Sequence, residues 1–584
     1  MTATLDSRRS RTRRWHPALV ALVVFGLYLV PVLIQFWHIL PHLATSEPEY
    51  GAGDLAKYNW SVAWVVYALS HGQGLFVSHV ANVPFGVNLL DDTSILGLGV
   101  VMSPVTALFG PFATVNLLLI AAFPLSASCG YLLARRYVGW RPAAFAAGLL
   151  YGYSPYMVSQ GYSHLNLSFA PLPPLILLVL DEMVVRQRRS PVRLGLLLGA
   201  LVAAQFFIST EILATTALFA AVAVITVCLF CRDQVRSHLR FALRSLAVAA
   251  VTSVALLAYP AYTAVLGPDH IHGAIGGFRI YVSALLGPVL PTSVLLFGTH
   301  HLKALGDQIG GNASENGSYL GVPLVVLLIA APLAVRKRTV VVPAVLALVA
   351  FVLSLGVRLH VGLPSLASST RLVILPAAVL YKIPLIGDSF PVRYSLYVAL
   401  FASLVLAAAL QALRRRAGIG AAALLAVIAL LPLVPAWPAP AQGHVGMPAY
   451  FTSGAVKELP AGQTVLVYPM AAPTNAAAMD WQAVSKMRFS MPGGYFVVPK
   501  QPSGSQFFTP TLTARTLGGL AAGRPVARTP AERSRLAGEL RAWHVRSVLV
   551  QPVGADPVGF FTWLIGRPPD ATSAGLSRWY DVRW

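Results

Sequence analysis

Residues 18–64, ALVALVVFGLYLVPVLIQFWHILPHLATSEPEYGAGDLAKYNWSVAW, place a long apolar run directly before a short acidic segment. The run from Ala18 to Trp37 is long enough to cross the ~30 Å hydrocarbon layer of a bilayer as one helix. The basic tail RRSRTRRWHP (8–17) precedes it, and no small-residue cleavage site of the signal-peptide type follows it. We therefore expect an uncleaved first membrane span, with the tail of residues 1–17 in the cytoplasm.

The composition extends this expectation to the whole chain. Of 584 residues, 56% are hydrophobic and 11% charged, with a mean hydropathy of +0.67, whereas soluble domains carry roughly 25% charged residues. A net charge of +22 could indicate a nucleic-acid partner, but the basic residues gather in short clusters between apolar runs, as they do in cytoplasmic loops. The predicted partner is therefore the lipid bilayer and not nucleic acid.

The basic clusters fix the orientation of the predicted spans. All of them are expected in the cytoplasm: Arg135-Arg136, RQRRSPVR (186–193), CRDQVRSHLR (231–240), RKR (336–338) and RRR (414–416). With that constraint the sequence predicts a multi-pass α-helical membrane protein of about eleven transmembrane helices. They are placed near 18–37, 112–134, 142–160, 166–184, 192–209, 211–230, 243–265, 318–335, 339–356, 391–413 and 418–436.

Two further helices are predicted in the first outer loop, residues 38–111. Segment 94–110 is apolar, but counting it as a span would put Arg135 and Arg136 outside. It is therefore predicted to lie along the outer surface, broken near Ser103-Pro104. Residues 54–70 form a companion helix because their apolar positions recur at helical spacing.

A change of composition ends the membrane domain, residues 18–436. VPAWPAPAQG (434–443) is a Pro-rich linker. Beyond it, TVLVYP (464–469) and VRSVLVQP (545–552) are strand-like, and TPAERSRLAGELRAWHV (529–545) indicates a helix that starts at Thr529 or Pro530. Residues 437–584 are thus predicted to form a small extracytoplasmic α/β domain.

Acidic residues on the predicted outer side are few, and Asp54 stands out among them. It follows Gly53 at the amino end of the predicted helix 54–70. Aspartate is favoured there as a helix cap, and Gly-Asp is common in turns. A cap and a catalytic base are compatible roles, and spacing alone leaves both open.

The order of elements carries a resemblance. A first span, an outer loop with acidic residues near its start, two juxtamembrane helices, a second span ending in YLLARRYVG (131–139) and a following FAAGLLYGYSP (145–155) resemble the GT-C superfamily of polyprenyl-phosphate-sugar-dependent glycosyltransferases. GDSFPVRYSLYVALFASLVLAAALQAL (387–413) and MDWQAVSKMRFSMPGGYF (479–496) resemble more specifically the bacterial YfhO-like branch.

The resemblance implies an inverting transferase at the outer face of the plasma (inner) membrane. It would move a sugar from a polyprenyl-phosphate donor to an envelope polysaccharide, glycolipid or protein. In that superfamily an acidic residue of the first outer loop acts as base toward the acceptor hydroxyl, and Asp54 is the matching position. Many relatives have an adjacent acidic pair there. Whether Asp91 or Asp92 supplies a second carboxylate, or the two only form a turn before 94–110, stays open.

A leaving lipid phosphate needs positive charge, and Arg393 in FPVRYSLY (390–397) is the first candidate to bind it. It opens a span at the outer surface against the positive-inside bias, and guanidinium matches phosphate geometry. Arg279 and Arg371 are further candidates. The alternative for each is an arginine that snorkels at a helix end.

Two more polar residues fall at predicted span ends. His164 lies at a predicted outer turn. It could bind a sugar hydroxyl, a phosphate or a metal ion there, or it could be an interfacial histidine that only forms hydrogen bonds. Glu211 is the first residue of a predicted span. A carboxylate at this depth indicates a polar cavity, but the amino end of a helix can also stabilise its charge. DHIH (269–272) offers metal-type donors without further ligands at a suitable spacing. The need for a divalent cation therefore stays undecided.

Two other functions compete with the transferase. A transporter or flippase of lipid-linked sugars often has paired repeats and charges near the membrane midplane. Here the acids lie at one surface and the outer loops are long and asymmetric, which favours chemistry at that surface. A non-catalytic scaffold for envelope assembly would leave Asp54 as a helix cap only.

Overall fold

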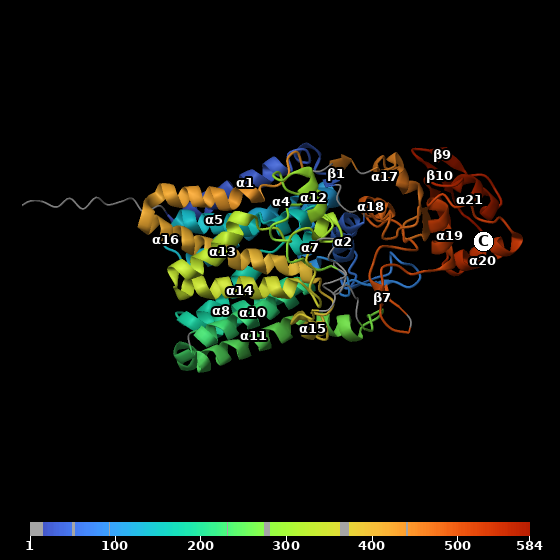
Figure 1. Ribbon diagram of the computed structural model, residues 1–584. Helices are drawn as coiled ribbons and strands as arrows, with labels where there is room; N and C mark the ends of the chain where they lie inside the picture. Colours follow the sequence, from blue (N-terminus) through green and yellow to red (C-terminus); the bar gives the residue numbers. More distant parts are fainter. Residues whose placement is uncertain are drawn as a thin grey trace, which may run out of the picture.

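The computed structural model describes residues 16–48, 53–92, 94–230, 232–273, 281–362, 373–439, 442–444, 446–500 and 502–584. A bundle of roughly parallel helices makes up one part of the molecule, and a C-terminal α/β region (residues 446–584) caps one of its ends (Figure 1). The candidate residues Arg279 and Arg371 lie outside the described residues.

The bundle is that of a multi-pass helical membrane protein. Among the described residues, six helices are long and apolar enough to cross a membrane and three more are apolar but shorter, so the count of about eleven stays a prediction. The bundle helices are α1 (Pro17–Gln35), α4 (Ser103–Arg135), α5 (Arg141–Gly152), α6 (Pro155–Gln160), α7 (Leu165–Ser168), α8 (Leu172–Asp181), α9 (Pro191–Phe206), α10 (Thr210–Phe230), α11 (Arg232–Leu266), α13 (Val322–Val335), α14 (Arg338–Ser354) and α16 (Ser395–Leu430).

Several predicted spans are interrupted helices. Residues 142–160 divide into α5 and α6, because Pro155 starts a new helix whose Ser154 cap accepts a hydrogen bond from the Met157 amide. Residues 166–184 divide into α7 and α8, which is followed by a π-helical turn, Glu182–Arg186. Gly418, at φ 87° and ψ 178°, breaks α16 between the predicted spans 391–413 and 418–436. The breaks at α6 and α7 place polar side chains at the end of the bundle.

The predicted basic clusters meet at one end of the bundle, which we call the basic end. Arg136 there pairs with Asp181 at 2.8 Å and also with Glu182. Arg414 lies over the Trp140 ring, 5.1 Å from its centroid. The C-terminal region and helix α2 lie at the opposite end (Figure 1), which we call the site end.

The segment predicted to lie along the surface, 94–110, is helical and broken. Residues Leu96–Val101 form α3, and Met102 separates it from α4, next to the predicted break. Gly110 makes a second break, at φ 86° and ψ 170°. The membrane-crossing part of α4 therefore begins near residue 111, close to the predicted start.

Helix α2 (Asp54–Ser70) has the predicted bounds and is mostly buried. Twelve of its seventeen residues are buried, because it lies between the bundle and the C-terminal region (Figure 1). The sequence predicted this companion helix, and the structure adds that the C-terminal region covers it. The indole rings of Trp60 and Trp64 occupy the face toward the C-terminal region, where they stack with centroids 5.9 Å apart.

The C-terminal region contains the predicted α/β sheet. Its strand order is β5-β8-β10-β9, with β5 (Val465–Tyr468) parallel to β8 (Ser547–Val550). Helix α20 (Pro530–Ala542) starts as predicted, with Thr529 accepting from the Glu532 amide at 3.2 Å.

The remaining helices and strands of the chain are β1 (Ser46–Pro48), β2 (Val77–Ser78), β3 (Val87–Asn88), α12 (His300–Gly306), α15 (Ala377–Leu380), β4 (Gln442–His444), α17 (Ala449–Thr452), α18 (Ala477–Val484), β6 (Val498–Pro499), β7 (Ser505–Gln506), α19 (Leu512–Ala521), α21 (Pro557–Ile565), β9 (Ala571–Ser573) and β10 (Leu576–Trp579).

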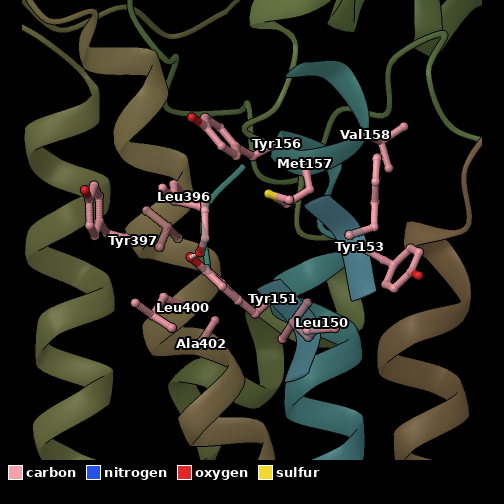
Figure 2. Close-up of a cluster of buried hydrophobic side chains, with 14 of the residues drawn as sticks. Leu150, Tyr151, Tyr153, Tyr156, Met157, Val158, Leu396, Tyr397, Leu400 and Ala402 are labelled. Atoms are coloured by element: carbon pink, nitrogen blue, oxygen red, sulfur yellow. Dashed lines mark hydrogen bonds between the residues drawn. The ribbon is translucent and has the colours of Figure 1, made fainter. Parts of the chain in front are cut away.

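Among the described residues, the two largest of four hydrophobic cores hold these parts in place. One fills the bundle, where Tyr151 of α5 and Leu400 of α16 pack together (Figure 2). The second joins α2 and the loop after it to the C-terminal region, and includes Trp64, Trp481 and Phe496. Strand β1, after the first span, also pairs with β4, after the last one. The first loop and the C-terminal region are therefore packed as one unit.

Candidate active site between the bundle and the C-terminal region

Asp54 is the first residue of α2, and Gly53 before it has φ +123°, which favours glycine. A Cβ at position 53 would lie 3.1 Å from both the Pro473 carbonyl oxygen and the Tyr495 ring. Glycine at this position thus lets the C-terminal region approach the helix start. Asp54 ends up at the junction of bundle and C-terminal region, with 24% of its side chain exposed.

The Asp54 carboxylate is held in its ionised form. Its Oδ2 lies 3.2 Å from His164 Nε2, and the Tyr495 hydroxyl donates a second hydrogen bond. Burial by itself raises the pKa of Asp54. The hydrogen bond and charge of His164, with the charge of Lys57 and the bond from Tyr495, outweigh burial and lower that pKa to about 2.

A chain of polar contacts runs from Asp54 into the bundle. His164 Nδ1 lies 2.6 Å from Gln160 Oε1, and Gln160 Nε2 donates to Glu315 Oε2 at 3.1 Å. Glu315 accepts from Arg393 Nε at 3.0 Å, and Arg393 Nη1 donates to Glu211 Oε2 at 2.6 Å. Asp54, His164, Glu211 and Arg393, four predicted site residues, thus belong to one network.

The network fixes where the protons lie. An ionised Glu315 only accepts hydrogen bonds, so the Gln160 amino group faces it and the Gln160 carbonyl faces His164. His164 Nδ1 must therefore carry a proton. The other ring nitrogen, Nε2, faces the Asp54 carboxylate.

Arg393 is engaged by two carboxylates in this structure. It pairs with Glu211 and Glu315 and also lies over the Phe390 ring, 4.1 Å from its centroid. Burial raises the pKa of Glu315, but the charge of Arg393 outweighs it and holds that pKa below its usual value. With all three side chains ionised, Arg393, Glu211 and Glu315 together carry a net charge of about −1.

A second ion pair lies beside Asp54. Lys57, one turn along α2, donates to Asp92 Oδ1 at 3.0 Å, with side chains only 4% and 1% exposed. Burial lowers the pKa of Lys57, but the charge of Asp92 outweighs it and the pKa lies above its usual value. A pocket extends from Asp92 past Asn166 to Glu211.

Asp91, in contrast, does not line this pocket. Its Oδ2 accepts a hydrogen bond from the Ile271 amide at 3.1 Å, and burial raises its pKa to about 7. In the same loop, His270 Nδ1 contacts the Gly267 carbonyl at 2.7 Å. Within the described ranges no group of three or more His, Cys, Asp or Glu side chains could hold a metal ion, so a divalent cation stays an open prediction.

Sequence reasoning missed four residues of the network. Glu315 belongs to the few acids on the predicted outer side, and Lys57 follows Asp54 at i+3, so both had a signal. Tyr495 had none, because Asp54 and Lys57 lie more than 400 positions before it. Gln160 is four residues from His164, but its second partner, Glu315, lies 155 positions later.

Comparisons with known proteins concern the fold. No protein-family model and no curated protein matches the chain. Among solved structures, the arabinofuranosyltransferase AftD from Mycobacteria is similar with a TM-score of 0.54 and 15% identity, over 97% of this chain and 40% of AftD. ArnT from Cupriavidus metallidurans has a TM-score of 0.49 and 11% identity, over 97% of this chain and 99% of ArnT. The chain thus spans less than half of AftD, and on that likeness it has the fold of the GT-C membrane glycosyltransferases.

Proposed function

We propose that this protein is an inverting glycosyltransferase at the outer face of the plasma membrane. It moves a sugar from a polyprenyl-phosphate donor to a hydroxyl of an envelope polysaccharide, glycolipid or protein. The GT-C fold shared with AftD supports this proposal. The observation that carries it is Asp54, an ionised, partly exposed carboxylate at the end of the bundle away from the basic clusters. It belongs to the same polar network as Glu211, which lines a pocket there.

The proposed reaction is a single displacement. The acceptor oxygen attacks the anomeric carbon, the bond from that carbon to the phosphate oxygen breaks, and its electron pair leaves with the lipid phosphate. The acceptor proton passes to Asp54, and such a base contributes about 10²–10⁴-fold. A carboxylate paired with His164 is a weak base, so the proposal includes movement of His164 away from Asp54 when substrates bind.

The donor phosphate is proposed to reach Arg393 from the pocket that Asp92 and Glu211 line. To bind it, Arg393 exchanges one of its two carboxylate partners for phosphate, for which its guanidinium is equally suited. Glu211 is the partner at the pocket wall and is the one expected to leave. Arg279 and Arg371 remain candidate phosphate ligands.

The test is transfer of labelled sugar from a panel of polyprenyl-phosphate donors to envelope extracts by the purified protein. Asp54→Asn is expected to fold and to lose about 10²–10⁴-fold of the activity. The matched control is Asp556→Asn, an exposed aspartate that caps α21 at the far side of the C-terminal region, and it should transfer normally.

Two results would contradict the transferase. If the native protein transfers no label but moves these lipids across vesicle membranes, it is a transporter. If it does neither while Asp54→Asn lowers only its stability, Asp54 is a helix cap in a non-catalytic scaffold.

A further inference from the structure

Tyr495 is contributed to the site by the C-terminal region. It follows Gly493 and Gly494, both at positive φ, 79° and 154°. A Cβ at Gly493 would meet Met470 at 2.8 Å. The Tyr495 amide donates to Met479 Sδ at 3.3 Å, so the glycine turn and α18 together fix where the ring lies.

Two side chains of α2 contact this tyrosine in different ways. Its ring lies against the start of α2, 3.1 Å from where a Cβ at Gly53 would stand, and its hydroxyl hydrogen-bonds the Asp54 carboxylate. The ammonium of Lys57 lies over its ring, 4.1 Å from the centroid, which is a cation–π distance. Tyr495 thus touches the predicted base and the one cation next to it on the same helix.

We propose that Tyr495 is a positioning residue of the active site, whose hydroxyl fixes the Asp54 carboxylate and whose ring holds Lys57 beside it. The inference rests on the proposed function and deepens it, since it makes the C-terminal region part of the reaction centre. His164 and Tyr495 reach Asp54 from the bundle and from the C-terminal region respectively. The carboxylate is oriented only when both parts are in place.

The physical reason is preorganisation. A carboxylate on one rotatable side chain samples several orientations unless donors hold it. A misplacement of about 1 Å at a reacting group costs on the order of 10²-fold in rate.

The competing role is packing alone, since Tyr495 also contacts Phe507 with ring centroids 6.2 Å apart. Tyr495→Phe separates the two roles because it keeps the ring, its packing and the contact with Lys57 but removes the hydroxyl. The matched control is Tyr468→Phe in the same region. There the lost hydroxyl donates to the Val553 carbonyl at 2.8 Å, away from Asp54.

In the transfer assay with full-length protein, Tyr495→Phe is expected to lower kcat about ten-fold and to leave KM for donor and acceptor unchanged. Tyr468→Phe should keep the native kcat. Because Tyr495 acts through Asp54, Tyr495→Phe added to Asp54→Asn should cause no further loss. An unchanged kcat in Tyr495→Phe, or losses that multiply in the double variant, would overturn the proposal.

A second measurement does not depend on activity. In protein with ¹³C-labelled tyrosine ring carbons, the resonance missing from Tyr495→Phe is that of Tyr495. It should shift in Asp54→Asn and stay in place in Asp556→Asn. If the native protein transfers no sugar, the proposed function fails while this shift still reports the Tyr495–Asp54 bond. If Asp54→Asn leaves the resonance unmoved, the positioning role fails whatever the activity.

Discussion

Arg393 lies at the centre of the polar network because it satisfies two carboxylates that the fold buries. Glu315 comes from a short 3-10 helix, Ala313–Glu315, and Glu211 from the first turn of α10, 78 and 182 residues away in sequence. The sequence singled out Arg393 from its position at the start of a span, and the structure adds that it already has partners. Its first role is to make two buried negative charges tolerable.

We therefore expect Arg393→Ala to be destabilising whatever the reaction. Removing one partner of a buried ion pair costs about 3–5 kcal/mol, because the other charge is left uncompensated. Denaturant unfolding in detergent measures this loss. Arg393→Ala combined with Glu211→Gln and Glu315→Gln should recover much of it, and a single variant as stable as the native protein would contradict the assignment.

Asp91 predicts a dependence of stability on pH. Its folded-state pKa of about 7 lies above the ordinary 3.8. Between these values the folded state binds a proton that the unfolded state does not, so its contribution to stability is full below pH 4 and is lost as the pH rises through 7. Asp91→Asn stays neutral. It should raise Tm above pH 7 by roughly 2–4 °C and change little near pH 4.

Thermal unfolding of both proteins across this pH range measures the effect. An equal gain in Tm at both ends of the range would mean that the substitution acts through shape and not through charge.

At the scale of elements, α2 connects the predicted site to the rest of the molecule. Its bounds were predicted correctly because they follow from local signals, the spacing of apolar residues and the Gly-Asp start. Its burial on both sides was not predicted, because the covering residues, Trp481 and Phe496, lie more than 400 positions later. Local order is encoded near the helix, whereas its environment depends on distant packing.

The start of α2 can be tested with two glycines. Gly53→Ala and Gly72→Ala each place a side chain at positive φ, 123° and 64°, at opposite ends of the helix. Only the new Cβ at position 53 meets neighbours, at 3.1 Å, whereas nothing lies within 4 Å at position 72. Gly53→Ala should reduce sugar transfer by up to about 10²-fold. Gly72→Ala should transfer normally, and equal losses would show that strain alone is responsible.

At the scale of the whole molecule, the sequence correctly predicted a GT-C membrane bundle followed by an α/β sheet. It also predicted many helix starts, because apolar runs, basic clusters and proline positions are local features. The sequence was less able to predict which polar residues contact one another. His164 and Arg393 were each predicted as site residues. Gln160, which contacts His164 directly and Arg393 by way of Glu315, looks in the sequence like an ordinary helix residue. Only the structure shows that α6 ends at the site.

The second core predicts that α2 and the C-terminal region open together. Trp481→Ala, in a core shared with Trp64, should cost about 3–5 kcal/mol. It should also lower hydrogen-exchange protection of the amides in α2 as well as those in β5. If Trp481→Ala lowers the hydrogen-exchange protection of β5 but not that of α2, the helix and the C-terminal region open independently.

Pairing of β1 with β4 joins the chain just after the first span to the chain just after the last. This ladder acts as a tether at the base of the C-terminal region and raises its effective concentration near α2 to at least the millimolar range of a short linker. When the contact between Tyr495 and Asp54 breaks, the C-terminal region therefore stays nearby, and the contact re-forms within the same molecule. The same region supplied as a separate chain would have to reach comparable concentrations to complete the site.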